Sequence, residues 1–291
     1  MNKRLPGYTF SLLHVDYVKL NEKWNYPNVI SPYLRIYYID EGEGLISTAH
    51  EQVKLEPGYL YIIPSFTLCH LSCNSYLSQY FLHFFEESAE GMSIFENNRK
   101  VIKVAANDTD ILNFRRLVDL SPGRGINRSD NPTIYEKNVY YKGYRNLNNT
   151  VSDPIFFETQ GIIFLLISRF LGSYRFQSKS PDPIPSKILD ATRHIQLNLK
   201  ENLTVKYLAD RANLHQDYFS RLFLKHTGQR PLSYLHEKRI ERAQYLIATT
   251  NMPFGQIAEK IGFESLPHFS KIFKNITSLP PGKYKKLNSF V

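Results

Sequence analysis

An internal repeat constrains this chain more than any other feature of its sequence. Two stretches, VKYLADRANLHQDYFSRLFLKHTG from Val205 and FGQIAEKIGFESLPHFSKIFKNIT from Phe254, each predict a short helix, a turn and a longer helix. Both contain an apolar residue followed by alanine, and both contain a Phe-Ser-basic-apolar-Phe segment, in which Phe269 lies 50 residues after Phe219. The C-terminal part of the chain is therefore predicted to hold two helix-turn-helix units.

The positive charge of the chain lies in the part that contains the repeat. The 291 residues carry a formal charge of +9. Residues 186–291 hold 17 Lys and Arg against 8 Asp and Glu, whereas residues 1–185 hold 19 of each. A neutral N-terminal part joined to a basic C-terminal part indicates that only the second faces a polyanion such as nucleic acid. The alternative is a basic surface that only keeps the domain soluble.

Cysteine usage and hydropathy indicate a cytoplasmic protein with no membrane partner. Cys69 and Cys73 are the two cysteines, and their spacing is neither a zinc pattern nor a disulfide framework, so two reduced thiols are expected. No continuous apolar segment follows the first charged residues, so a signal peptide is not expected. The longest apolar run, Ile162 to Ile167, is far shorter than the roughly 20 residues that span a bilayer.

The N-terminal part predicts short strands followed by helices. Turns such as Glu56-Pro57-Gly58 recur within residues 30–86 and separate apolar and aromatic runs, which is typical of a β-sandwich or small barrel. The predicted strands are residues 34–39, 45–49, 52–55, 59–63 and 77–85. The predicted helices are residues 110–120, 155–170 and, after a polar loop that begins near Asn127, residues 135–146.

The strand region resembles a cupin. The resemblance lies in G-E-G after residues 34–39, in L-E-P-G-Y-L-Y-I-I-P, and in His70 six residues after Pro64. Metal-dependent cupins carry an H-x-H pair, whereas His50 stands alone in the corresponding region, and a catalytic metal needs about three protein ligands. We therefore expect no metal, no cofactor and no catalytic residues, and a cupin without metal ligands more often binds a small molecule. A metal-dependent cupin enzyme fused to a DNA-binding module is the alternative.

Two strands offer polar side chains for such a small-molecule pocket. Alternation along a strand puts Gln79, Phe81 and His83 on one face, and it puts Arg35 and Tyr37 on one face of an earlier strand. The alternative for each residue is a place in an ordinary core, with His83 as a satisfied buried histidine. The predicted effector-binding residues are Trp24, Arg35, Tyr37, Gln79, Phe81 and His83.

The helix at Ile155 to Phe170 is apolar around most of its circumference, so it must be buried on several sides. One side can pack on the barrel, and another either meets the same helix of a second subunit or is buried within one subunit. The segment from Ser173 to Ser186 is rich in Ser and Pro, which predicts an extended linker. The predicted organisation is a sensing and dimerisation domain over 1–172, a linker over 173–186 and a DNA-binding domain over 187–291.

The C-terminal domain predicts seven helices. Thr204 and Gly228 provide start and stop signals, and Pro231 begins the longest helix. In a helix-turn-helix, the second helix enters the major groove of double-stranded DNA, so the apolar residues of that helix must face the domain core. The predicted helices are residues 187–198, 205–211, 216–228, 231–249, 253–262, 265–275 and a short one from 281 through 284. The predicted DNA-binding residues are Asp217, Tyr218, Ser220, Arg221, Lys225, Leu266, Pro267, His268, Ser270, Lys271 and Lys274.

These residues resemble the AraC/XylS family of bacterial transcription regulators over about a hundred positions. The matching residues are Leu208-Ala209, Tyr218 to Phe223, Thr227-Gly228, Arg239-Ile240, Ala243, Leu246, Ile257-Ala258-Glu259, Gly262-Phe263, Phe269 to Lys274, Pro281 and Tyr284-Lys285. The resemblance implies an α+β protein with a cupin-like N-terminal β-barrel and accessory helices, followed by an all-α domain of two helix-turn-helix units joined by a long helix.

The resemblance also implies a function. It implies a dimeric regulator, taken here as an activator, that contacts two successive segments of the major groove and RNA polymerase, under the control of a small-molecule effector such as a sugar or metabolite. Base contacts carried over by position fall on Asp217, Ser220 and Arg221 and then on Leu266, Pro267 and Lys271. A protein that coats nucleic acid without sequence preference is a further alternative.

Departures from the family pattern predict that the first helix-turn-helix unit contributes most of the specificity for DNA sequence. The side chains of Leu266 and Pro267 cannot hydrogen-bond a base edge, whereas Arg221 can bond guanine bidentately. Lys225 and Lys274 suit phosphate contacts, which fix register without reading sequence. His215 stands where the family often has a serine cap, Ser278 replaces the usual glycine, and Lys285 replaces the usual arginine.

Overall fold

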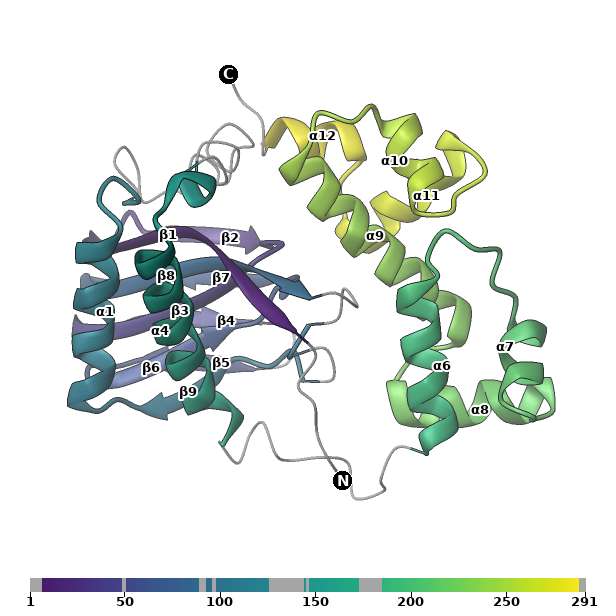
Figure 1. Cartoon of the computed structure of the whole chain (residues 1–291), viewed down its shortest axis with the longest axis horizontal. Coiled ribbons are helices and arrows are strands. Elements are labelled where there is room, and N and C mark those ends of the chain that lie inside the picture. Colours follow the sequence, from purple (N-terminus) through teal and green to yellow (C-terminus); the bar gives the residue numbers. More distant parts are fainter. Residues whose placement is uncertain are drawn as a thin grey trace. The chain divides into compact units, whose positions relative to one another are not determined.

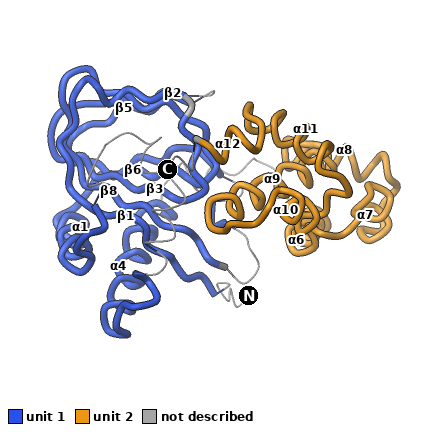
Figure 2. The backbone as a smooth tube through the Cα atoms, turned by 90° about the horizontal axis from the view of Figure 1, so that it is seen from above, with its two compact units in different colours: residues 1–88, 93–178, 289–291 blue, residues 89–92, 179–288 orange. Residues whose placement is uncertain are grey.

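The structure is a computed structural model that describes residues 7–48, 51–88, 93–95, 98–125, 144, 147–172 and 185–287. The chain divides into two compact units (Figure 2): unit 1 contains residues 1–88 and 93–178, and unit 2 contains residues 179–288. The predicted loop and helix between 127 and 149 and the predicted linker lie almost entirely outside the described residues. The domain boundaries proposed from the sequence therefore stay predictions.

Unit 1 contains two antiparallel sheets (Figure 1). In sheet order, the five-stranded sheet comprises β1 (Tyr8–Asn21), β8 (Tyr76–Ser88), β3 (Leu34–Gly42), β6 (Tyr59–Ile63) and β9 (Ile102–Ala105). The four-stranded sheet comprises β2 (Asn25–Val29), β7 (Cys69–Ser72), β4 (Gly44–Ser47) and β5 (Gln52–Leu55). The described strands of the two sheets are not hydrogen-bonded to each other, so the predicted cupin-like barrel is a pair of facing sheets rather than a closed cylinder.

The sequence predicted five of these strands and missed β1, β2, β7 and β9. The largest omission is β1, which pairs with β8 along its whole length. The pairing register shifts between Leu12 and His14, so the alternation of apolar and polar residues is interrupted in the middle of the strand. A strand with an interrupted period, whose paired residues lie 55 to 80 positions away in the sequence, gives little local signal.

Both faces of the five-stranded sheet are buried, which explains why its strands are apolar on both sides. From β3, Leu34 and Ile36 join a core beneath α1 (Asp108–Leu120) and α4 (Asp153–Leu171). The intervening Tyr37 joins a second core that contains residues of both sheets. Successive side chains of a strand point to opposite faces, so β3 serves two cores at once. The predicted helices at 110–120 and 155–170 are confirmed as α1 and α4.

Side chains cap the free edge of β1, which has β8 on one side only. The amide of Gln160, on α4, accepts a hydrogen bond from the Phe10 N–H at 2.8 Å and donates one to the Phe10 carbonyl at 2.7 Å. The Leu12 carbonyl accepts from the Arg124 guanidinium at 2.8 Å and from the Asn148 amide at 3.0 Å. These bonds satisfy backbone groups that would otherwise form an exposed template for strand pairing.

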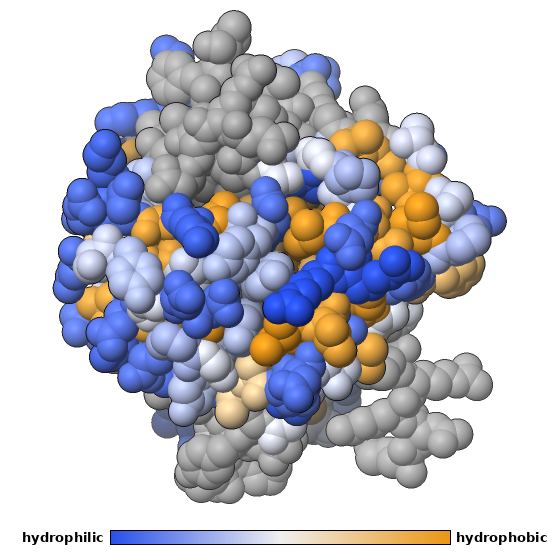
Figure 3. Space-filling model, turned by 90° about the vertical axis from the view of Figure 1, so that its left-hand side faces the viewer, coloured by the Kyte–Doolittle hydropathy of each residue, from blue (hydrophilic) through white to orange (hydrophobic). Residues whose placement is uncertain are grey.

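One face of α4 remains exposed. Phe157, Phe164 and Leu165 are 70%, 43% and 55% exposed, and Gly161 lies on the same face. Figure 3 shows apolar surface, interrupted by hydrophilic side chains, on the side of the molecule that carries α1 and α4. Among the described residues, α4 is also the one helix whose length and composition would suit a membrane span, a test that core helices of soluble proteins pass as well. Burial within one subunit, one of the two alternatives for this helix, therefore does not account for all of its apolar residues.

Unit 2 contains the predicted helices with nearly the predicted bounds. They are α6 (Ser186–Leu197), α7 (Val205–Arg211), α8 (Gln216–Thr227), α9 (Pro231–Thr249), α10 (Phe254–Lys260), α11 (Leu266–Thr277) and α12 (Pro281–Leu287). The first copy of the repeat forms α7 and α8, the second copy forms α10 and α11, and α9 packs against helices of both copies.

The two copies repeat their contacts as well as their sequence. Phe219 and Phe223 lie with ring centroids 5.6 Å apart, and Phe269 and Phe273 with centroids 5.5 Å apart. Phe223 then meets Tyr234 at the start of α9 edge to face, and Phe273 meets Tyr284 of α12 in the same way. Tyr284 also follows Tyr234 by 50 residues, so the repeat extends to a third helix, which the sequence comparison had not included.

Left-handed residues end the second helix of each copy. The first copy uses Gly228 (φ 76°), as predicted, and the second uses Ser278 (φ 62°). A left-handed conformation costs an L-residue roughly 1–2 kcal/mol because its Cβ approaches the backbone, whereas glycine has no Cβ.

We predict that Ser278→Gly stabilises unit 2 by about 0.5–1 kcal/mol, which is the relief of backbone strain minus the greater entropy that glycine loses on folding. Urea unfolding of the full chain, followed by a signal from unit 2, measures the change. The reciprocal Gly228→Ser is the matched control and should destabilise by a similar amount, because no atom lies within 4 Å of the added Cβ. A loss of stability in Ser278→Gly would contradict the prediction.

Candidate nucleic-acid interface

The helices α8 and α11 present equivalent surfaces to solvent. Phe219 and Phe223 are fully buried, and Phe269 and Phe273 are buried at the same positions of α11. The residues between them follow one pattern of exposure in both helices, with the serine after the first phenylalanine half-buried and the basic residue after it exposed. A helical period with one buried face leaves the opposite face free for a partner.

The predicted DNA-contact residues lie on these solvent faces. The exposed ones are Asp217, Tyr218, Arg221, Lys225, Leu266, Pro267, His268, Lys271 and Lys274, and the half-buried ones are Ser220 and Ser270. Among the described contacts, Arg221, Lys271 and Lys274 have no carboxylate within salt-bridge distance, so their charges remain available to a phosphate or a base edge.

Side-chain caps mark the start of α7, α8 and α11, whereas α10 begins after Pro253 without one. The Thr204 hydroxyl accepts from the Tyr207 N–H at 3.1 Å, as its position predicted. At the start of α8, the His215 ring accepts from the Asp217 N–H at 3.4 Å, and at the start of α11 the Ser265 hydroxyl accepts from the His268 N–H at 3.4 Å. The His215 ring therefore takes the capping role that serine has in the second copy.

A buried arginine of α9 fixes the second copy relative to the segment before the first. The Arg239 guanidinium donates to the carbonyls of Leu199 and Glu201 at 2.9 and 2.8 Å, and it lies over the Phe263 ring at 5.4 Å. Burial lowers the pKa of Arg239, but the group stays charged at neutral pH. The sequence analysis named Arg239 only among the residues that match the family pattern, because charge and periodicity do not reveal a backbone partner 40 residues away.

The six predicted effector residues lie together in unit 1. Cross-strand pairing places Arg35 opposite His83 and Tyr37 opposite Phe81 on β3 and β8, as strand alternation suggested. All six, Trp24, Arg35, Tyr37, Gln79, Phe81 and His83, are buried. Burial also suits the alternative, in which they are ordinary core residues.

Two buried histidines of unit 1 have pKa values far below that of an ordinary imidazole. Burial first, and then electrostatic repulsion from the His14 and Arg35 side chains, lower the pKa of His83 well below its ordinary value. Burial and the nearby Arg124 charge lower the pKa of His14 to about 3. Both imidazoles are therefore neutral at physiological pH, and a neutral imidazole can donate one hydrogen bond and accept another. The buried Gln79 side-chain oxygen has no hydrogen-bond partner in the described part of the chain.

Within the described residues, no three His, Cys, Asp or Glu side chains lie close enough together to hold a metal ion. Cys69 and Cys73 are free and buried, as two reduced thiols require. Burial raises the pKa of the Cys73 thiol, which makes it less reactive.

Comparisons with known proteins identify the repeat. A helix-turn-helix domain family matches residues 208–287. The HTH-type transcriptional regulator YisR of Bacillus subtilis is 38% identical over 100 residues, which are 34% of this chain and 35% of YisR. The arabinose operon regulatory protein of Escherichia coli is 28% identical over 104 residues, 35% of this chain and 36% of that protein. Such matches cover little more than a third of each relative.

Two longer similarities include unit 1. The raffinose operon transcriptional regulatory protein RafR of Pediococcus pentosaceus is 24% identical over 285 residues, which are 97% of this chain and 90% of RafR. The crystal structure of ToxT from Vibrio cholerae with a bound unsaturated fatty acid matches with a TM-score of 0.54 at 14% identity, over 99% of each chain. At that identity the structural match establishes a shared fold.

Proposed function

We propose that this chain, whose C-terminal unit carries a helix-turn-helix domain of the AraC/XylS type, is a cytoplasmic, sequence-specific DNA-binding transcription regulator and not an enzyme. The observation that supports this most directly is the matched exposure of α8 and α11 on a unit whose sequence carries all of the net positive charge. One basic helix is an ordinary solvated surface, but two equivalent ones suit two neighbouring segments of a major groove. As an activator, the protein would also contact RNA polymerase.

In this proposal Arg221 is the main base-reading residue. Its guanidinium can donate two parallel bonds to guanine, which are worth about 1–3 kcal/mol of discrimination. Lys271 occupies the equivalent place on α11 but offers a point charge rather than a fork, and it follows Leu266 and Pro267, which have no polar side-chain atoms. Asp217, Ser220 and Tyr218 are close in sequence to Arg221 and would contribute to the same segment, while Lys225 and Lys274 bind phosphates.

The test is selection of duplexes from a random library with the full chain, followed by affinity measurements at physiological salt. We expect an enriched site with two elements about 10–10.5 base pairs apart. Arg221→Ala should relax base preference in one element by about 1–3 kcal/mol, and Lys271→Ala should relax the other less. Lys225→Ala should weaken all sequences alike and reduce the salt dependence of binding.

Lys206→Ala is a suitable control, because Lys206 is exposed on α7 and not on a recognition helix. Equal relaxation by Arg221→Ala and Lys271→Ala would contradict the predicted dominance of the first copy. Binding without any enriched site, which fades steeply as salt rises, would replace the proposed function with non-specific coating of nucleic acid.

The effector of the proposed regulator is a small molecule bound between the two sheets of unit 1. Arg35, Gln79 and His83 supply polar groups among the aromatic rings of Trp24, Tyr37 and Phe81, a combination that suits a small polar ligand. RafR, a relative that aligns over both units, is named for a raffinose operon, which favours a sugar over other metabolites. A buried oxygen without a partner, such as that of Gln79, is the kind of group that a ligand hydroxyl can satisfy.

We predict that raffinose, or one of its component sugars, raises the melting temperature of the full chain, since a ligand that binds only the folded state stabilises it. Gln79→Leu should keep or increase the stability of the free protein, because the side-chain oxygen of Gln79 has no described bond to lose. The same variant should weaken the sugar effect. Differential scanning fluorimetry measures both quantities. If no sugar shifts the wild-type protein, the effector is not of this class.

The regulator is a homodimer through the exposed face of α4 in this proposal. Burying each of Phe157, Phe164 and Leu165 against a second copy would contribute roughly 1.5–3 kcal/mol. Gly161 lies among them with open space around its Cα, so a partner helix could approach closely. A self-complementary contact of this kind is the usual interface of a twofold dimer.

We predict that wild-type protein sediments as a dimer at micromolar concentration and that Phe157→Ser combined with Leu165→Ser makes it a monomer. Leu112→Ser is the matched control, because Leu112 is a similarly exposed apolar residue (60%) on the neighbouring α1. Analytical ultracentrifugation distinguishes the states. A wild-type monomer, or an equal effect of the control, would show that α4 is not the interface.

A further inference from the structure

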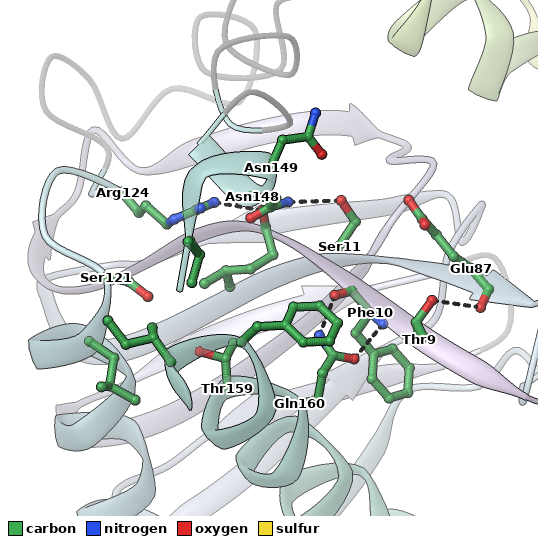
Figure 4. Close-up of a pocket in the computed structure, with 15 residues that line it drawn as sticks. Thr9, Phe10, Ser11, Glu87, Ser121, Arg124, Asn148, Asn149, Thr159 and Gln160 are labelled. Atoms are coloured by element: carbon green, nitrogen blue, oxygen red, sulfur yellow. Dashed lines mark hydrogen bonds between the residues drawn. The ribbon is translucent and has the colours of Figure 1, made fainter. Parts of the chain in front are cut away.

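A cavity opens beside the free edge of β1, outside the space between the two sheets (Figure 4). Its volume is about 260 Å³, and its walls come from β1, the end of α1 and the first turns of α4. This is smaller than the roughly 300–1,000 Å³ of pockets for drug-sized ligands, so the cavity suits a small metabolite. It shares no residue with the six side chains assigned to the effector.

Part of its polar lining has a structural task. Gln160 and Asn148 direct their amides to the backbone of β1 and to Ser11, and these bonds cap the strand edge. Their presence therefore says nothing about a ligand.

Three other polar groups line the cavity and are not all needed to cap the edge of β1. Ser121 and Thr159 are each 7% exposed and line the cavity, and among the described contacts neither hydroxyl makes a hydrogen bond. Neither hydroxyl is a fully enclosed atom without a partner, so both face the open space of the cavity. The Arg124 side chain is 4% exposed and makes one hydrogen bond, to the Leu12 carbonyl, although a guanidinium has five N–H donors. Donors that face an open cavity and have few protein partners are available to a ligand that displaces water from it.

The charges around the cavity define the chemistry of that occupant. Arg124 is the buried cation, and burial lowers its pKa to about 10, so it remains charged but lacks the solvation of a surface arginine. Glu87, exposed at the rim, opposes ligands with several negative charges. His14 lies in the adjacent core, where burial and the Arg124 charge lower its pKa to about 3, so it stays neutral. One buried positive charge and one rim carboxylate favour a ligand with a single negative charge.

The remaining wall is apolar. Leu12, Leu120, Ile155 and Phe156 line the cavity beside the polar groups. A ligand that fits both parts has an apolar body and one carboxylate, which a guanidinium binds bidentately.

We infer that this cavity is a second ligand site, which binds small monocarboxylates, with Arg124 pairing the carboxylate and the Ser121 and Thr159 hydroxyls donating hydrogen bonds to it. The site lies against the first turns of α4, the helix whose opposite face is exposed. The inference does not depend on DNA binding, because its readout is ligand affinity.

Calorimetric titration of the full chain with benzoate and hexanoate tests the site, with benzamide as the uncharged analogue of benzoate. We expect both acids to bind and benzamide to bind at least tenfold more weakly. Arg124→Gln keeps a donor for the Leu12 carbonyl but removes the charge, and it should weaken benzoate binding at least tenfold. Arg116→Gln is the matched control, since Arg116 is exposed on α1 and pairs with Glu158, and it should bind as wild type does.

If Arg124→Gln does not fold, the combination of Ser121→Ala with Thr159→Val decides, because it leaves the bond to Leu12 in place and should still weaken benzoate binding several-fold. Gln79→Leu should leave benzoate affinity unchanged, which separates this site from the effector site between the sheets. Absence of binding by both acids, equal binding of benzamide, or unchanged affinity in the cavity variants would overturn the inference.

Discussion

The arrangement of unit 2 depends on one buried guanidinium. Arg239 extends from the middle of α9 to two carbonyls in the segment between α6 and α7, and its other face lies over Phe263 of the second copy. A Cβ on Gly262 would lie 2.6 Å from an Arg239 nitrogen and 2.5 Å from the Leu199 oxygen, so this position accepts only glycine. Charge-assisted hydrogen bonds are about twice as strong as neutral ones, and here they join three segments that are remote in the sequence. The distance between the two recognition helices therefore depends on packing around α9 rather than on either copy alone.

The two copies of the repeat share the contacts that the fold requires and differ in the solvent-facing residues that would contact DNA. The last turn of each recognition helix is held by an equivalent hydrogen bond: the Thr227 hydroxyl donates to the Phe223 carbonyl at 2.8 Å, and the Thr277 hydroxyl donates to the Phe273 carbonyl at 2.8 Å. The solvent faces differ, with Arg221 in one copy and Lys271 in the other. A duplicated scaffold with different outer residues is what two unequal half-elements of one site would need.

Sequence reasoning succeeded where the interactions are local and failed where they are not. Helix starts and stops in unit 2 depend on caps and periodicity within a few residues, so the predicted bounds of α7 and α9 were correct and α11 ended only two residues later than expected. The omitted β1 depends on β8, and its edge depends on Gln160, 150 residues away. For the same reason the solvent-facing residues of α8 and α11 could be listed from the sequence, whereas the cavity around Arg124 could not.

Unit 1 holds more buried polarity than its sheets require. A core of this size would be stable with apolar residues alone, because each buried polar group loses its hydration and regains at most the hydrogen bonds that its surroundings offer. Yet Arg35, His83 and Gln79 lie between the sheets, and Arg124 lies beside them at the strand edge. A neutral imidazole can donate one hydrogen bond and accept another, and the Gln79 side-chain oxygen has no partner among the described residues, so such groups can bind a ligand. Residues 1–185 carry no net formal charge, so unit 1 would contribute little to DNA affinity by itself. The free-energy cost of burying its polar groups is best explained by ligands that bind to those groups.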